Sequence, residues 1–459
     1  MQSRRDLVQA QAYLNGRLAS ALVQADPDAS ETPTRRTSMG MLIGVALLVV
    51  AVLGAAGFAL IFGGRSDQWR EPGAFIIDRD TGSRYVLADG TLRPVLNLAS
   101  AKLLLGTSMR VVRVAHGSLE GTPHGPTVGI PGAPEVLPGP GLRTNVWQAC
   151  ATGSAAGDER PVALSLGTGP APGARELAGD EAFWVTGPDD DRYLLWRGQR
   201  LRAAAPALAN ALGYTEDGAS RVAAGLLNMI PAGPDLTGVD VAGRGRPAAV
   251  LGGTQTRTGQ VLVVQSPGAP DRFLLQTGTG LAALSTVDAQ LVLADPATRE
   301  AYPGQQVRAL PLSVAAAASA ARSTVPGREG LPTTPPRLVA EPGAGPCAEL
   351  TSRADGYGVR LLAGRPAGGR PPAAEPAITV GPEVAASISV TPSGGALVRP
   401  RLASGAPGLA RYLVTDLGVK YPVTSAAAEA LGLPPAEEIA VPAGVLDLLP
   451  TGPELALPS

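Results

Sequence analysis

The sequence predicts an α+β protein with a single N-terminal transmembrane helix. An elongated extracytoplasmic region follows, in which four homologous small α/β repeat domains surround a central β-rich domain. Three observations lead to this fold class. Residues 39–64 carry no charged side chain, a short strand pattern recurs four times further along the chain, and 58 glycines and 44 prolines punctuate the Val-, Leu- and Ala-rich segments. Glycine and proline at this frequency favour many short elements joined by turns.

The uncharged stretch is long enough to cross a bilayer as one helix. It is too long for a signal-peptide core, and no small-x-small cleavage site follows, so we expect a retained anchor. Arg35 and Arg36 precede it, but Arg65 and Arg70 follow it, so the flanking charges do not decide the orientation. The short tail before the span and the much longer chain after it favour a single-pass protein with a cytoplasmic N-terminus and its bulk outside the cytoplasm.

The tail before the span is predicted to contain an amphipathic helix. Leu7, Leu14, Leu18 and Leu22 fall near one helical face. Such a helix could lie on anionic lipid headgroups or dock on a cytoplasmic partner. We expect it to end by Pro27, and Pro33 to keep the following linker from forming a helix.

An Arg-aromatic-aliphatic-aliphatic pattern marks the four predicted repeats. In each repeat the residue 39 positions after the arginine is a proline, and in three repeats this proline opens a Pro-x-Gly-Pro sequence. The third repeat lacks that ending. The landmark arginines and prolines are Arg84 and Pro123, Arg192 and Pro231, Arg272 and Pro311, and Arg411 and Pro450.

Each repeat is predicted to run strand, turn, second strand, short helix, then a closing segment before the proline. Gly213 and Gly432 follow two of these helices and are plausible C-terminal caps. A unit of this size buries too little apolar surface alone, so we expect the repeats to pack on neighbours.

The segments between repeats predict the rest of the domain organisation. Strand-like stretches on either side of the second and third repeats predict a central β domain that contains Cys150 and Cys347, and the Ala-, Pro-, Thr- and Gly-rich stretch 314–346 predicts a surface connection of low order. The predicted domains are a cytoplasmic tail (1–38), a transmembrane helix (39–64), repeat 1 (65–128), the first segment of the central domain (129–182), repeat 2 (183–240), repeat 3 (241–320), a linker with the second segment of the central domain (321–400), and repeat 4 (401–459).

Cys150 and Cys347 are the two cysteines of the chain. They could be independent buried thiols, but outside the cytoplasm a disulfide is favoured.

Few residues suit catalysis, a metal or a nucleotide. His116 and His124 are the two histidines and fall in one Gly/Pro-rich segment, so a His-dependent catalytic triad elsewhere is excluded. Neither Lys102 nor Lys420, the two lysines, stands in a Gly-Lys-Ser/Thr phosphate-binding loop. The acid cluster 189–191 favours a solvated turn over a calcium site. A net charge of −1 gives no reason to expect nucleic acid. We therefore predict no catalytic residue, metal or cofactor, no small-molecule substrate and no enzymatic activity.

Several segments resemble the EccB family of type VII (ESX) secretion subunits from actinobacteria. They are the tail SRRDLVQAQAYLNGRLASALVQADPDA with the single span after it, RYVLADGTLRPVLNLASAKLLLG (84–106), GIPGAPEVLP (129–138) with Trp147-Gln-Ala-Cys150, and RYLVTDLGVKYPV (411–423) with LLPTGPEL. The resemblance runs from end to end of the chain. It implies four repeat domains around a central domain, and a disulfide that Cys150 and Cys347 match. It also implies assembly in the inner membrane with EccC, EccD and EccE.

The expected function is therefore that of a structural core component of an inner-membrane secretion complex, an extracytoplasmic scaffold that supports protein export and associates with further copies of itself. The alternative is a membrane-tethered extracytoplasmic enzyme, such as an ATPase, or an envelope-glycan-binding protein.

Overall fold

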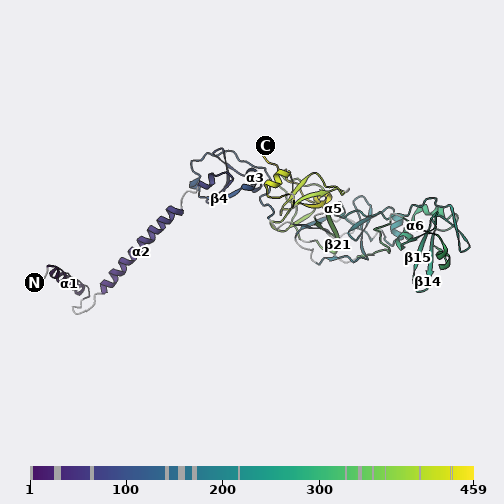
Figure 1. Cartoon of the computed structure of the whole chain (residues 1–459), viewed down its shortest axis with the longest axis horizontal. Coiled ribbons are helices and arrows are strands. Elements are labelled where there is room, and N and C mark those ends of the chain that lie inside the picture. Colours follow the sequence, from purple (N-terminus) through teal and green to yellow (C-terminus); the bar gives the residue numbers. More distant parts are fainter. Residues whose placement is uncertain are drawn as a thin grey trace. The chain divides into compact units, whose positions relative to one another are not determined.

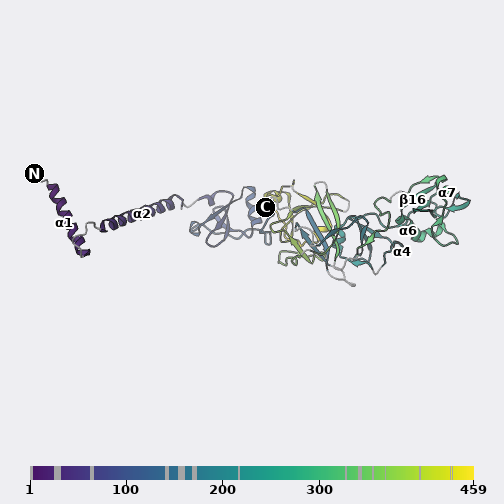
Figure 2. The ribbon, with the colours of Figure 1, turned by 90° about the horizontal axis from the view of Figure 1, so that it is seen from below.

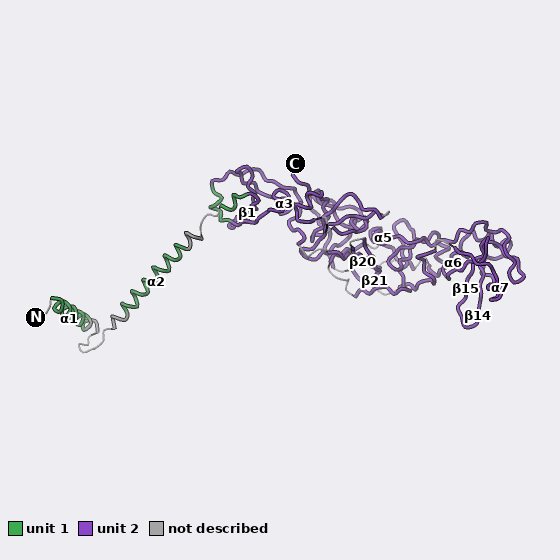
Figure 3. The backbone as a smooth tube through the Cα atoms, in the orientation of Figure 1, with its two compact units in different colours: residues 1–71, 114–120 green, residues 72–113, 121–459 purple. Residues whose placement is uncertain are grey.

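The computed structural model describes residues 4–24, 33–62, 67–139, 144–152, 161–167, 173–215, 218–325, 328–339, 344–353, 356–366, 368–402, 405–434, 436 and 438–458. The chain divides into two compact units, residues 1–71 with 114–120 and residues 72–113 with 121–459 (Figure 3).

The first unit is dominated by two helices, α1 (Arg4–Gln24) and α2 (Pro33–Phe62) (Figure 1). The four leucines of the predicted amphipathic face lie on α1 and are exposed. Residues 37–57 of α2 are long and apolar enough to cross a membrane. The predicted break at Pro33 is wrong, because proline is tolerated in the first turn of a helix and Pro33 begins α2. Pro27 and the predicted end of the span, Gly64, lie outside the described residues. Two short 3-10 helices complete this unit, η1 (Asp67–Arg70) and η3 (His116–Ser118).

The second unit contains four small sheets with a common connection. In each, three consecutive strands pair antiparallel, a helix follows, and a later strand returns beside the first. The returning strand is parallel to the first in the second, third and fourth sheets. Such a return needs a crossover, which the helix supplies.

The elements of these sheets are as follows. The first has β1 (Ala74–Asp78), β2 (Arg84–Ala88), β3 (Thr91–Pro94), α3 (Leu98–Leu105), η2 (Gly106–Ser108) and β4 (Arg110–Val114). The second has β8 (Glu181–Thr186), β9 (Arg192–Trp196), β10 (Gln199–Ala203), α4 (Pro206–Ala211), β11 (Ser220–Arg221) and α5 (Ala224–Met229). The third has β14 (Val261–Ser266), β15 (Ala269–Gln276), β16 (Leu281–Leu284), α6 (Thr286–Ala294), η5 (Pro296–Ala301), β17 (Leu310–Pro311), α7 (Val314–Ser319) and β18 (Arg322–Ser323), preceded by the hairpin β12 (Pro247–Leu251) and β13 (Thr254–Arg257). The fourth has β23 (Ala396–Arg401), β24 (Arg411–Val414), β25 (Lys420–Val423), α8 (Ser425–Ala430), β26 (Ile439–Pro442) and α9 (Ala443–Asp447).

Three of the landmark prolines have the same backbone contact. The carbonyls of Pro123, Pro231 and Pro450 accept N–H bonds of 2.8, 2.9 and 2.9 Å from the third strands of their sheets. In the third sheet the equivalent bond, from Leu281 to the carbonyl of Ala321, measures 2.7 Å.

Pro311 instead lies in β17, beside the first strand of the third sheet. The predicted landmark Pro311 is therefore wrong. The chain between α6 and β17, which contains η5, is longer than its counterparts, so a fixed offset from Arg272 falls short of the equivalent position.

The Pro-x-Gly-Pro sequence has a steric basis. A Cβ added at Gly125, Gly233 or Gly452 would lie 2.9, 2.5 or 2.3 Å from a side-chain atom of the third strand beside it. Glycine permits the close approach of these two segments.

A six-stranded central sheet combines two segments far apart in the sequence. Its order is β22-β6-β5-β20-β21-β7. The strands are β5 (Val146–Ala151), β6 (Val162–Leu166), β7 (Arg175–Glu176), β20 (Gly345–Arg353), β21 (Gly356–Gly364) and β22 (Ser387–Val390). The β5–β6 pair and the β20–β21 pair meet where β5 lies antiparallel to β20.

The stretch 314–346 is more ordered than predicted. It contains α7, β18 and β19 (Arg337–Leu338), which extends the second sheet by pairing with β8. Leu331 is buried in the core of that sheet. Apolar side chains of the stretch 314–346 pack against elements that are distant in sequence. The composition of the stretch alone does not reveal these contacts. Residues 326–327 and 340–343 lie outside the described residues.

Candidate functional site

Pairs of helices join the small sheets within the second unit. Helix α3 contacts α8, α4 contacts α6, and α5 contacts α9. Figure 2 shows α4 beside α6. The α5–α9 pair lies on the largest hydrophobic core, which also contains Trp147, Leu164 and Leu350 of the central sheet. These contacts are the means by which one sheet positions the next.

Arg200 and Lys420 support the helices of the α5–α9 pair in the same way. Each lies at or next to the start of the third strand of its sheet. Each cation donates to a carbonyl near the end of the second helix after that strand: Arg200 to Leu227 of α5, and Lys420 Nζ to Leu446 of α9 at 2.5 Å. A cation at a helix C-terminus is favourable. Burial lowers the pKa of both side chains. The equivalent positions of the first and third sheets hold Leu92 and Leu281.

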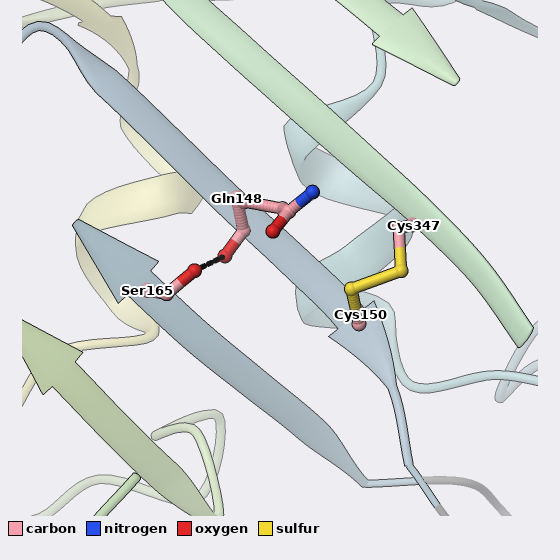
Figure 4. Close-up of a disulfide and its surroundings, with 4 residues drawn as sticks. All are labelled: Gln148, Cys150, Ser165 and Cys347. Carbon is pink, nitrogen blue, oxygen red and sulfur yellow. Dashed lines mark hydrogen bonds between the residues drawn. A yellow bond between two sulfur atoms is a disulfide. The ribbon is translucent and has the colours of Figure 1, made fainter. Parts of the chain in front are cut away.

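A disulfide joins Cys150 of β5 to Cys347 of β20, which lie directly opposite each other (Figure 4). It therefore links the two hairpins of the central sheet. Ser165 Oγ donates to the Gln148 carbonyl oxygen at 3.5 Å in the neighbouring strand pair.

A buried carboxylate, Glu181, pairs with two arginines and links two parts of the second unit. Glu181 accepts bonds from Arg175 at 2.6 Å and Arg337 at 2.8 Å. Hydrogen bonding from Arg175 lowers the pKa of Glu181. Because Arg337 comes from β19 and Glu181 from β8, the group ties the segment after the third sheet to the second sheet.

Sequence reasoning missed a largely buried ion pair in that same segment. Arg328 contacts Asp288 of α6, with N–O distances of 2.6 and 2.7 Å, and donates to the Thr237 carbonyl. The Ser285-x-x-Asp288 spacing does indicate a capping box, which is present, but no sequence signal connects Asp288 to Arg328.

The residues considered as catalytic or metal-binding candidates have separate contacts. His116 and His124 are exposed, and His124 stacks edge-on against Tyr85 at 5.7 Å. Asp190 accepts a bond from Arg221 at 2.7 Å, and Asp191 lies 3.6 Å from Arg202. Within the described residues no group of three or more His, Cys, Asp or Glu could hold a metal ion.

The landmark arginines differ in their contacts. Arg84 pairs with Glu135, and Arg411 with Glu438 at 2.5 Å. Arg272 lies within β15 and not at its start.

These features define a class: a mixed α/β chain with one candidate N-terminal span, whose sheets are joined by helix pairs, ion pairs and a disulfide. The chain belongs to the EccB family, since the family model described as "Type VII secretion system ESX-1, transport TM domain B" matches residues 1–458. The predicted family is confirmed.

Two curated relatives carry EccB names. ESX-3 secretion system ATPase EccB3 of Mycolicibacterium smegmatis is 30% identical over 97% of this chain and 87% of its own length. ESX-5 secretion system ATPase EccB5 of Mycobacterium tuberculosis is 30% identical over 63% of this chain, and the match spans 58% of that relative's length.

Two solved structures have the same fold. A chain of an intact ESX-5 inner membrane complex matches 99% of this chain and 94% of its own, at 25% identity and a TM-score of 0.64. An EccB3 dimer from an ESX-3 core complex covers 83% of this chain and 98% of its own, at 26% identity and a TM-score of 0.66. A further match, at 25% identity and a TM-score of 0.65, is a chain of the periplasmic assembly from the ESX-5 inner membrane complex, in agreement with the predicted inner-membrane location.

The prediction that the chain is not an enzyme is contradicted by these comparisons, because the EccB relatives are named ATPases. That prediction relied on the absence of known catalytic and nucleotide-binding sequence motifs. A nucleotide site assembled from residues distant in sequence, or between subunits, leaves no such motif.

Proposed function

We propose that the chain is a structural core subunit of an inner-membrane type VII secretion complex, anchored by α2, with its second unit on the periplasmic side. The match of 99% of the chain to a subunit of a solved ESX-5 inner membrane complex carries this proposal. The partners are the other membrane subunits, EccC, EccD and EccE, and a second copy of the chain, as in the EccB3 dimer.

The four small sheets are four copies of one repeat unit arranged around the central sheet. The second begins with β8 at Glu181, the third extends to β18 and the fourth begins with β23 at Ala396, so these repeats extend beyond the boundaries predicted above. Their shared order of strands supports this, as does the common bond from the third strand to Pro123, Pro231, Ala321 or Pro450. Repeats joined by buried helix pairs form a rigid framework, which suits a scaffold.

Affinity purification of the full-length chain in mild detergent tests the proposal. The other membrane subunits are expected in the eluate, and a chain that is recovered alone and monomeric contradicts it. Thiol labelling of membrane vesicles of known sidedness tests the location. The disulfide is reduced and the chain is denatured from one side of the membrane at a time. Cys150 and Cys347 should then be labelled from the periplasmic side. Labelling from the cytoplasmic side would overturn the orientation.

ATP hydrolysis is the second candidate function, favoured by the names of the curated relatives. Phosphate release by the purified complex, compared with the complex that lacks this chain, tests it. A rate that does not depend on the chain contradicts hydrolysis by this subunit.

A further inference from the structure

The helix pairs of the second unit join like with like. Helices α3, α4, α6 and α8 each follow the third strand of their sheet, and they pair as α3 with α8 and α4 with α6. Helices α5 and α9 each follow the returning strand of their sheet, and they pair with each other. These contacts order the four sheets as first, fourth, second and third. The third sheet ends this order, and α7 is the helix that follows its returning strand.

Helix α7 is the equivalent of α5 and α9. In all three sheets the segment that contains this helix ends at a carbonyl that accepts an N–H bond from the third strand, at Pro231, Pro450 and Ala321. The residues six positions before these carbonyls are Gly225 of α5, Gly444 of α9 and Ala315 of α7. The three helices therefore match residue by residue.

The outer face of α7 corresponds to the surface that α5 and α9 bury against each other. Val314 is 50% exposed, and Ala315 and Ser319 are exposed as well. The equivalent residues of the α5–α9 pair are buried or half-buried, and they are Ala224, Gly225 and Met229 of α5 and Ala443, Gly444 and Leu448 of α9. Helix α7 thus exposes a surface whose two equivalents are covered.

The inner face of α7 holds the helix on the third sheet. The Ser313 hydroxyl accepts the Ala316 N–H at 3.2 Å and caps the first turn. Ala316 and Ala317 are half-buried, and α7 contacts β14. Ala320, directly after the helix, packs on a cluster of Leu251, Leu262 and Leu281. The outer face is therefore presented by a helix that is fixed from the other side.

The side chains of α7 suit a contact with a second α7. In the α5–α9 pair, Gly225 faces Leu448, and the absence of a side chain on the glycine leaves room for the leucine. Ala315 and Ser319 stand at the equivalent positions of α7, so a larger residue replaces the glycine and a smaller one replaces the leucine. Two α7 helices in the same arrangement would place Ala315 of each against Ser319 of the other. Helix α7 carries no charged side chain that would oppose this contact.

The corresponding segment of the first sheet has a different character. Gly117 lies six residues before Pro123, and His116 and Glu120 beside it are exposed and polar. Polar outer faces are typical of the terminal units of repeat arrays. The uncharged outer face of α7 lacks this feature, which favours a contact with another protein surface.

We propose that α7 packs against α7 of a second copy of the chain, in the arrangement of the α5–α9 pair. Both helices present the same surface, as a two-fold dimer requires. A helix of six residues buries too little surface to hold a dimer by itself, so the contact adds to others between the copies. This inference rests on the proposed function, which includes a second copy of the chain, and assigns a surface to that copy.

Cysteine cross-linking of the full-length chain in native membranes tests this inference. Two differently tagged copies are co-expressed, one with Ala315→Cys and the other with Ser319→Cys. The native cysteines are already joined to each other, so a mild oxidant should link the two introduced thiols into a covalent dimer that carries both tags. Ala426→Cys in both copies is the control, because Ala426 is an exposed alanine of another short helix, α8. This control should yield several times less dimer.

A charge placed in the contact should remove it. Val314→Glu, added to both cysteine variants, should lower the yield of dimer several-fold, because like charges would then face each other. Val380→Glu is the matched control, since Val380 is 49% exposed and lies outside α7, and it should leave the yield unchanged.

Three results would overturn the inference. They are a yield no higher than that of the Ala426→Cys control, a yield that Val314→Glu does not change, and a cross-link to another protein in place of the second copy. Recovery of the other membrane subunits is measured on the same membranes. If those subunits are recovered while the α7 cross-link is absent, this inference fails and the proposed function stands.

Discussion

Gly225 of α5 and Gly444 of α9 occupy equivalent positions in two matching segments, AGLLNMIP (224–231) and AGVLDLLP (443–450), and each faces the other helix. A Cβ at Gly225 would lie 2.3 Å from Leu448 Cδ2, and a Cβ at Gly444 would lie 2.5 Å from Asn228 Cβ. The second and fourth sheets therefore meet through equivalent surfaces, and the absence of side chains at these two positions permits the contact.

Replacing Gly444 by alanine should lower the free energy of unfolding by about 1–3 kcal/mol, the usual cost of inserting a methyl group into a close-packed interior. Urea unfolding of the full chain, followed by tryptophan fluorescence, measures the change. Gly278→Ala is the control, because nothing lies within 4 Å of the Cβ it adds. Equal losses in the two variants would show that the close contact is not the cause.

The disulfide should contribute strongly to stability. It joins residues 197 positions apart, and closing a loop of that size stabilises a folded chain by up to about 5 kcal/mol in the chain-entropy estimate. Reduction with dithiothreitol should lower the unfolding midpoint in urea. The double variant Cys150→Ser/Cys347→Ser should unfold at that lower midpoint with or without reductant. A chain whose midpoint is the same before and after reduction contradicts the prediction.

The sequence predicted the repeating strands because their pattern is local: each Arg-aromatic-aliphatic-aliphatic segment lies in a strand, and Gly213 and Gly432 have φ values of +84° and +81° after their helices. Pro311 was misassigned because a fixed offset cannot detect the longer connection between α6 and β17. Leu331 and Arg328 were missed because their partners are distant in sequence.

Tyr421 should make stability fall at alkaline pH. Its side chain is 1% exposed, and burial, together with the smaller effects of the charges of Glu375 and Asp416, raises its pKa from 10.0 to about 12. Because the folded-state pKa is the higher one, the stabilisation is present below pH 10 and is lost as the pH rises from 10 to about 12.

At 1.36 kcal/mol per pKa unit, Tyr421→Phe should lose about 2–3 kcal/mol less than the unchanged chain over this interval. Urea unfolding at pH 9 and pH 12 measures the difference. Tyr13→Phe, which changes an exposed ring of α1, should follow the unchanged chain. If Tyr421→Phe loses as much stability as the unchanged chain, this phenol is not the group responsible.

The ion pair between Arg328 and Asp288 should matter far more than one at the surface. The two side chains are 14% and 10% exposed, whereas those of Arg202 and Asp235 are 47% and 42% exposed. Arg328→Met leaves the Asp288 carboxylate buried without its cation, which costs about 3–5 kcal/mol in a typical interior. Removing the exposed pair by Asp235→Ala should cost less than about 1 kcal/mol. Urea unfolding of both variants measures the contrast, and limited proteolysis should cleave residues 328–339 faster in Arg328→Met alone. Similar losses in the two variants would mean that Arg328 does not hold this segment against α6.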